Sequence, residues 1–142
     1  MVTGSHTPPE YNGLKMVVDG RALTSDEIQA LYDRIIQHPF CPSTRQGTYT
    51  QTSFNTAYCD RITSDITIRR PLKVVIDCGN GIGGAIAPAL FEQLLSPMQG
   101  TLTCLYETVD GTFPHHHPDP SVPANLDDLI QAVQDHQADI GL

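Results

Sequence analysis

The chain has 142 residues, of which 39% are apolar and 17% charged, and its formal net charge is −8. This length allows one domain, or two small or incomplete ones. The negative charge argues against nucleic acid and anionic membranes as partners, and no apolar run is long enough to span a bilayer. The four cysteines lack CxxC spacing, which indicates reduced thiols and a cytoplasmic location.

The first regular elements are predicted close to the N-terminus. Residues 14–18 favour a short strand, with a turn at Asp19-Gly20. Thr24 and Glu27 then have the spacing of a capping box. Apolar residues recur behind them at helical intervals, as Ile28, Leu31, Ile35 and Ile36. The pattern predicts an amphipathic helix over residues 25–37.

A compositional change divides the chain. Residues 39–53 are rich in proline, serine, threonine, glycine and glutamine, which is typical of a linker. We therefore expect a boundary near residue 51, with domains at 1–50 and 51–142. A helix is predicted over 54–66, because apolar residues follow there at four-residue intervals, namely Phe54, Tyr58, Ile62 and Ile66.

The second half alternates strand and helix patterns. Strands are predicted at residues 74–76 and 101–106, and the last five residues indicate the start of another. Helices are predicted over 85–95 and 125–136, the second capped by Asn125. The residues expected to face inward are Ile86, Ala89, Leu90 and Leu94 in the first helix, and Leu126, Leu129, Ile130 and Val133 in the second. This alternation predicts the α/β class, with helices covering the sheet.

The stretch TGSHTPPEYNG, residues 3–13, lacks a core-building pattern. Gly4 can adopt backbone angles that other residues avoid, so Ser5 can stand at a sharp, exposed turn. A hydroxyl presented in this way can serve as a nucleophile or carry a phosphoryl group. A turn serine bonded to its own backbone is the alternative, and for an isolated Gly-Ser-His it would be the preferred one.

Three ordered blocks resemble the α-D-phosphohexomutases, and most closely their bacterial phosphomannomutase/phosphoglucomutase branch. The first is TGSHTPPEYNG itself, which is similar to the phosphoserine loop of that family. The others are LKVVIDCGNG, residues 72–81, and VDGTFP running into HHPDP, residues 109–120. The resemblance implies helix-covered mixed sheets in two partial domains: the end of a first domain and most of a second.

The resemblance assigns Ser5, His6 and Lys15 to the catalytic site, with Ser5 as the phosphorylated residue. Lys15 follows Ser5 closely enough for the chain to fold it back beside the phosphate, and phosphoryl transfer depends on such charge neutralisation. A solvated edge lysine and a loop histidine are the alternatives without the resemblance. Thr7 departs from the asparagine that the family usually has, which leaves the hydrogen bonding around the phosphoserine open, and Glu10 replaces the common aspartate.

The implied activity is the interconversion of hexose 6-phosphates and hexose 1-phosphates, of mannose or glucose, through a bisphosphorylated intermediate. Glucose 1,6-bisphosphate would be the activator. Mg²⁺ would be bound by the phosphate on Ser5 and by an Asp-rich loop that we expect beyond Leu142. The parent enzyme is expected to be a cytoplasmic monomer. We expect the present chain to be an inactive fragment, truncated before the metal loop.

Two other motifs have alternative interpretations. Residues 79–84 fit GxGxxG between a predicted strand and a predicted helix, so an NAD(P)-binding oxidoreductase domain is one alternative. Asp77 would place a negative charge near a bound pyrophosphate, which disfavours it. His115–His117 with Asp119 suggest a zinc site, but the neighbouring prolines favour an ordered connection. A non-catalytic α/β module is the remaining alternative.

Overall fold

The computed structural model describes residues 1–3, 10–38 and 42–142. The chain divides into two units, one formed by Met1–Thr3 with Asn12–Thr52 and the other containing Ser53–Leu142. No helix in the described ranges is both long and apolar enough to cross a membrane. The described part of the predicted linker, residues 42–53, contains neither helix nor strand.

The first unit consists of two small antiparallel pairs and one helix. Strand β1 (Val2–Thr3) pairs with β2 (Gly13–Leu14), and β3 (Val17–Val18) pairs with β4 (Arg21–Ala22). The single strand predicted over residues 14–18 is therefore wrong. It is two strands, because its two halves pair with different partners. Asp19 and Gly20 both have positive φ, at 49° and 75°, which suits the tight hairpin between β3 and β4.

Helix α1 (Ser25–Gln37) begins and ends where the sequence predicts. The Thr24 hydroxyl accepts a bond from the Glu27 N–H, and the Glu27 carboxylate accepts one from the Thr24 N–H at 2.8 Å. Both halves of the capping box are thus present. The Arg21 guanidinium adds two bonds to the same carboxylate, at 2.6 and 2.9 Å. These bonds, with Arg21 first, lower the pKa of Glu27 to about 2.

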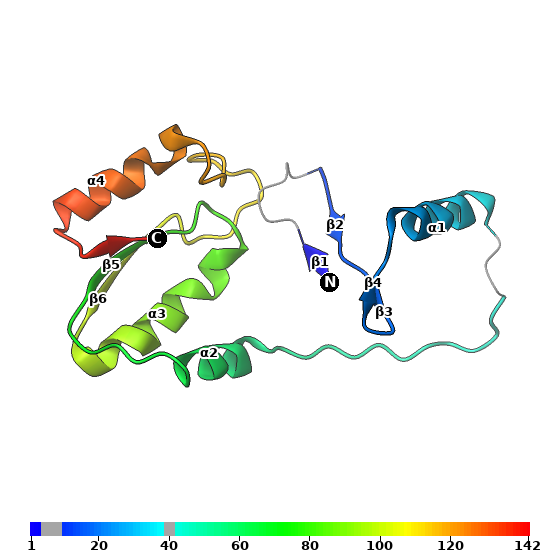
Figure 1. Ribbon diagram of the computed structural model, residues 1–142, viewed down its shortest axis with the longest axis horizontal. Coiled ribbons are helices and arrows are strands. Elements are labelled where there is room, and N and C mark those ends of the chain that lie inside the picture. The colour runs from blue at the N-terminus through cyan, green and yellow to red at the C-terminus, as the bar shows by residue number, and fades with distance from the viewer. Residues whose placement is uncertain (4–9, 39–41) are drawn as a thin grey trace. The chain divides into compact units, whose positions relative to one another are not determined.

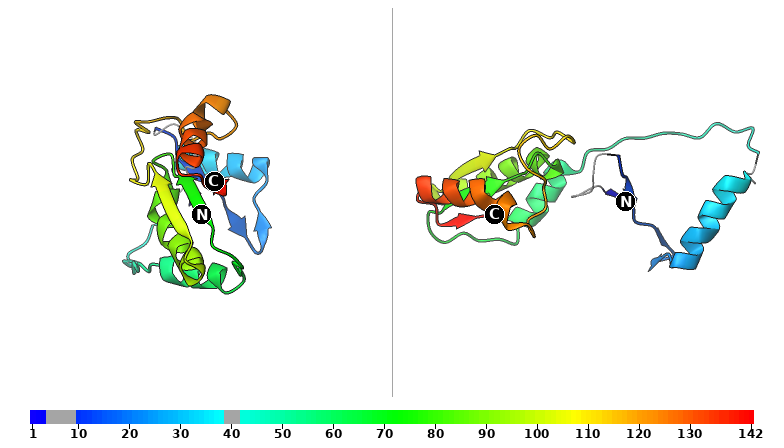
Figure 2. Two further views of the ribbon diagram at one scale, coloured as in Figure 1. Left: turned by 90° about the vertical axis from the view of Figure 1, so that its left-hand side faces the viewer. Right: turned by 90° about the horizontal axis from the view of Figure 1, so that it is seen from above.

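The second unit is an α/β/α sandwich. Its parallel sheet has the order β6-β5-β7, formed by β5 (Lys73–Asp77), β6 (Thr101–Leu105) and β7 (Ile140–Gly141). Helix α3 (Ala87–Leu95) covers one face and α4 (Asp127–Asp135) the other (Figure 1, Figure 2). Short 3-10 helices precede or follow them, at η1 (Ile82–Ala85), η2 (Ser96–Met98) and η3 (Pro123–Leu126). The α/β class is confirmed, and the antiparallel pairs are confined to the first unit.

The core of the sandwich is centred on β5. Val74 and Ile76 pack with Leu95 of α3, while Val75 is completely buried. Consecutive strand residues point to opposite faces, so burial of all three requires a helix on each face. The run of apolar residues that predicted a strand at 74–76 is thus explained by the central position of β5.

Three helices differ from their predicted bounds or faces. Helix α2 (Asn55–Thr63) ends before the predicted residue 66, where the hydroxyls of Thr63 and Ser64 bond to preceding carbonyls. In α3 the predicted inward Ala89 is exposed, and Phe91 and Leu95 pack on the sheet instead.

Two predictions about α4 are also wrong. Ile130 is 51% exposed and does not belong to the buried face of this helix. Asn125 does not cap it, since Asn125 lies within η3 and its amide donates to the Asp119 carbonyl at 2.9 Å.

Candidate functional site

Strands β1 and β2 join the two ends of the motif that the sequence marks as functional. Thr3 and Gly13, its first and last residues, are partners in the antiparallel pair. The ladder continues outward, with the Lys15 N–H donating to the Met1 carbonyl at 2.9 Å and the Met1 amino group donating to the Lys15 carbonyl at 2.8 Å. The motif therefore has a hydrogen-bonded base, and Lys15 lies beside that base.

Of the three predicted catalytic residues, only Lys15 can be located. Ser5 and His6 lie outside the described residues, as does Thr7. Lys15 is exposed and lines a hollow of about 510 Å³ in the first unit, together with Glu27 and Leu31 of α1. Its ammonium is thus accessible to a charged group, as a lysine that neutralises phosphate requires.

The described residues do not supply a metal centre. They contain no group of three or more histidine, cysteine, aspartate or glutamate side chains that could hold an ion. Residues 115–119, considered above for zinc, are therefore not part of such a group. His115 and His116 bond to different side chains, those of Asn80 and Asp77.

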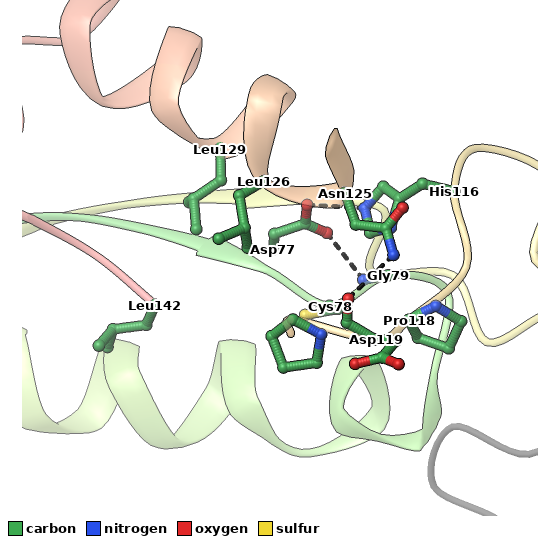
Figure 3. Close-up of a pocket in the computed structure, with 11 residues that line it drawn as sticks. Asp77, Cys78, Gly79, His116, Pro118, Asp119, Asn125, Leu126, Leu129 and Leu142 are labelled. Atoms are coloured by element: carbon green, nitrogen blue, oxygen red, sulfur yellow. Dashed lines mark hydrogen bonds and ion pairs between the residues drawn. The ribbon is translucent and has the colours of Figure 1, made fainter. Parts of the chain in front are cut away.

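A second set of polar side chains meets at the carboxyl end of β5, around a cavity of about 290 Å³ (Figure 3). His116 Nε2 lies 2.8 Å from Asp77 Oδ2, and the side chains of both residues are largely buried. The other carboxylate oxygen of Asp77 accepts the Gly79 N–H at 2.8 Å. Leu126 and Leu129 form the apolar wall of the cavity.

Next to this pair lies a second histidine contact. The buried Asn80 donates its amide to the Thr108 carbonyl at 2.8 Å, so its Oδ1 accepts from His115 Nδ1 at 2.7 Å. The His115 ring stacks on Tyr106 with centroids 3.8 Å apart. The Tyr106 hydroxyl donates to Asp128 of α4 at 2.6 Å, and this bond, aided by burial, raises the pKa of Tyr106 to about 12.

The sequence did not reveal these pairings. Asp77 and His116 lie in two of the blocks that resemble the family, but the residues themselves do not predict that their side chains meet. The partners are 39 residues apart, and neither belongs to a periodic pattern that could connect them. The one available signal was position, because Asp77 ends a buried parallel strand, where polar groups of α/β sheets meet.

The geometry of the glycine turn disfavours dinucleotide binding. Three backbone N–H groups of the turn already have acceptors within the protein: Gly79 bonds to Asp77, Asn80 to the Tyr106 carbonyl and Gly81 to the Cys78 carbonyl. The turn also leads into a four-residue 3-10 helix rather than directly into α3. Residues 79–84 therefore form a structural turn.

Cys78 also lines the cavity, but it is a poor nucleophile. Burial, followed by the charges of Cys104, Asp77 and Glu107, raises the pKa of Cys78 to about 11. The thiol therefore stays protonated at neutral pH.

Both units match models of one family. Residues 56–142 match the model described as phosphoglucomutase/phosphomannomutase, alpha/beta/alpha domain II, and residues 1–40 match that of domain I. The parallel sandwich of the second unit is thus an α/β/α domain of this type. The chain belongs to the phosphoglucomutase/phosphomannomutase family.

Individual relatives agree with this assignment. The chain is 46% identical over its whole length to a phosphomannomutase/phosphoglucomutase of Pseudomonas aeruginosa and 45% identical to a phosphoglucomutase of Neisseria meningitidis. It spans 29% and 30% of those two proteins. A crystal structure of a phosphoglucomutase/phosphomannomutase family protein from Burkholderia thailandensis matches 99% of the chain with a TM-score of 0.85. The two sequences are 46% identical, and the match covers 29% of the Burkholderia chain.

Proposed function

We propose that this chain is part of a phosphohexomutase that interconverts hexose 6-phosphates and hexose 1-phosphates, with Ser5 as the phosphoryl carrier. The observation that supports this most is the antiparallel pair of Thr3 and Gly13, which closes the base of TGSHTPPEYNG in a member of this family. The substrates would be mannose and glucose phosphates, as the relatives' names suggest.

In the proposed reaction, phosphate leaves Ser5 and later returns to it. The bond between phosphorus and Ser5 Oγ breaks as a bond to a sugar hydroxyl oxygen forms, and the hydroxyl proton is transferred in net terms to Ser5 Oγ. The sugar then carries two phosphates. After it turns over in the site, the other phosphoryl group returns to Ser5, so glucose 1,6-bisphosphate is both intermediate and activator. His6 and the positive charge of Lys15 would orient and neutralise the group in transfer.

Magnesium is implied by the same proposal, but the described residues do not by themselves form a site for it. They contain no cluster of ligands for a cation, and Ser5, the one ligand proposed in this chain, lies outside them. No step of the reaction is therefore assigned to the metal.

The same proposal divides the chain into parts of two domains. Residues 1–50 would be the C-terminal part of a first domain, with the phosphoserine loop, and residues 51–142 would belong to a second domain. We propose that the whole enzyme acts in the cytoplasm as a monomer.

Intact-mass spectrometry tests the phosphoryl carrier directly. After incubation with glucose 1,6-bisphosphate, we expect the natural protein to gain a phosphoryl group and Ser5→Ala to gain none. Ser53→Ala, at an exposed serine outside the motif, is the matched control and should still be phosphorylated. If the natural protein gains no phosphate, the chain is better described as a non-catalytic α/β module. If Ser5→Ala gains as much as the natural protein, Ser5 is not the phosphoryl carrier.

A further inference from the structure

The ring of His116 contacts two hydrogen-bond acceptors at once. Nε2 lies 2.8 Å from the Asp77 carboxylate and Nδ1 lies 3.0 Å from the His117 carbonyl oxygen. Neither a carboxylate nor a carbonyl can donate, so both bonds exist only when both ring nitrogens carry a proton. The geometry therefore requires the imidazolium form of His116.

His115 provides a contrast on the same segment. Its Nδ1 bonds to the neutral amide oxygen of Asn80, and a neutral ring with its proton on Nδ1 satisfies that bond. The hydrogen bonds of these two neighbouring histidines thus require different protonation. Those of His116 require the charged ring, whereas that of His115 requires only a proton on Nδ1.

The surroundings of His116 are acidic on several sides. Asp77 faces the ring from the end of β5, and Asp128 lies on α4, where it holds the Tyr106 hydroxyl. Cys78 and Asp119 line the same cavity, and Tyr106 meets the ring edge-on with centroids 5.5 Å apart. His115 and His117 flank the ring in the sequence. Burial opposes the charge on the ring, but the bonds to His117 and Asp77 and the negative charges of Asp77 and Asp128 outweigh it and raise the pKa of His116.

Backbone in the left-handed region occurs at three residues in or near the segment that carries His116. Asn80, Tyr106 and Phe113 all have left-handed backbone, with φ of 57°, 50° and 48°. For residues other than glycine such angles are unfavourable and persist only where surrounding contacts hold them. The contact between Asp77 and His116 lies at the end of β5, the central strand. The chain passes from β5 to β6 on one side of it and later returns to β7 on the other side. In open α/β sheets, ligands bind in the crevice at such a point.

We propose that the Asp77–His116 pair is a pH-sensitive latch that fixes residues 113–118 to the carboxyl end of β5. With the ring protonated, Nε2 holds the segment to the Asp77 carboxylate by a charge-assisted bond, while Nδ1 bonds to the His117 carbonyl within the segment itself. When the ring loses one proton, the lone pair of one nitrogen faces an acceptor oxygen. The Asp77 carboxylate keeps the remaining N–H, but its bond to the ring loses the attraction of the ring charge, and Nδ1 loses its bond to the His117 carbonyl. The segment is therefore held less firmly beside the cavity.

The sign of the pH dependence follows from the direction of the shift. The folded-state pKa of His116 lies above the ordinary histidine value of 6.5. The stabilising contribution of the latch is therefore complete below that value and is lost as pH rises through the folded-state pKa. The latch opens on the alkaline side.

Two measurements on the intact protein test the latch. Long-range ¹H–¹⁵N spectra of the imidazole rings report the protonation of each nitrogen. Hydrogen exchange of residues 113–118, corrected for the intrinsic pH dependence of exchange, reports opening. Over a pH series that brackets 6.5, we expect His116 to be doubly protonated at 6.5 and to lose its proton at higher pH, with protection falling in parallel. A neutral His116 at pH 6.5, or protection unchanged across its titration, would overturn the proposal.

Variants separate the latch from a general effect of pH. Asp77→Asn keeps an oxygen for the Gly79 N–H but removes the charge, so the His116 titration and the loss of protection should both move to lower pH. His116→Gln should remove the pH dependence of protection. His115→Gln, the matched control, should leave that dependence in place, and its loss in this variant would contradict the assignment to His116.

Discussion

A Cβ atom built on Gly84 would lie 1.9 Å from the carbonyl oxygen of Glu107 and 2.7 Å from its carbonyl carbon. Two backbone segments therefore touch at this point, one from η1 and one from the residues after β6. The glycine is required by this close approach rather than by a ligand. The last glycine of the GxGxxG pattern thus allows two backbone segments of the same chain to pack closely.

The first prediction concerns that contact. Gly84→Ala should lower the free energy of unfolding by about 3 kcal/mol or more, because backbone rather than a flexible side chain obstructs the methyl group. Gly83→Ala is the matched control: a Cβ there meets nothing within 4 Å, and a change within about 1 kcal/mol in either direction is expected. Denaturant unfolding measures both. Equal effects of the two substitutions would show that the close approach is absent in solution.

The second prediction concerns the core under α3. Leu95 is 3% exposed and packs against Val74 and Ile76 of the central strand. Leu95→Ala should cost about 2–5 kcal/mol, since it removes buried methyl groups and leaves a cavity. Ile82→Ala, at a residue 71% exposed, should change stability by no more than about 0.5 kcal/mol. A Leu95→Ala loss as small as that of Ile82→Ala, measured by thermal or denaturant unfolding, would contradict the assigned core.

The third prediction concerns pH and the start of α1. Bonds from Arg21 and Thr24 hold the pKa of Glu27 at about 2, below its ordinary value of 4.5. Stabilisation by this carboxylate is therefore complete above pH 4.5 and is lost as pH falls through 2. Glu27→Gln should reduce hydrogen-exchange protection of α1 at neutral pH, and its difference from the natural protein should shrink as the solution is acidified.

Asp26→Asn is the control for that experiment, because it removes a carboxylate from the same first turn. We expect Asp26→Asn to lower the protection of α1 less than Glu27→Gln does. If the two variants behave alike, the general attraction of the helix N-terminus for negative charge explains the effect, and the specific bonds to Glu27 do not.

The fourth prediction concerns catalysis by these residues alone. The chain spans about 30% of the relatives it matches. A polypeptide limited to residues 1–142 should therefore show no mutase turnover. A coupled assay with glucose 1-phosphate, glucose 1,6-bisphosphate and magnesium measures this, with a full-length family member as positive control. Turnover comparable to that control would contradict the prediction.

Local features of the chain were determined by the sequence alone. The capping box of Thr24 and Glu27 defined the first residue of α1, because a helix N-terminus is satisfied by side chains three positions apart. The apolar run at residues 74–76 identified the central strand, because burial on both faces excludes polar residues. The motif at residues 3–13 and the two blocks after it indicated the family, which the comparisons confirm.

Only the tertiary structure decided which distant residues meet. Asp77 and His116, like Gly84 and Glu107, are brought together by crossovers of the parallel sheet, and such contacts leave no periodic trace in the chain. The inward faces of α3 and α4 were partly misassigned for the same reason. The apolar residues of each helix allow more than one inward-facing stripe, and packing against the sheet decides which stripe is buried. Hydrogen bonds between near neighbours are encoded locally, whereas burial is a property of the assembled layers.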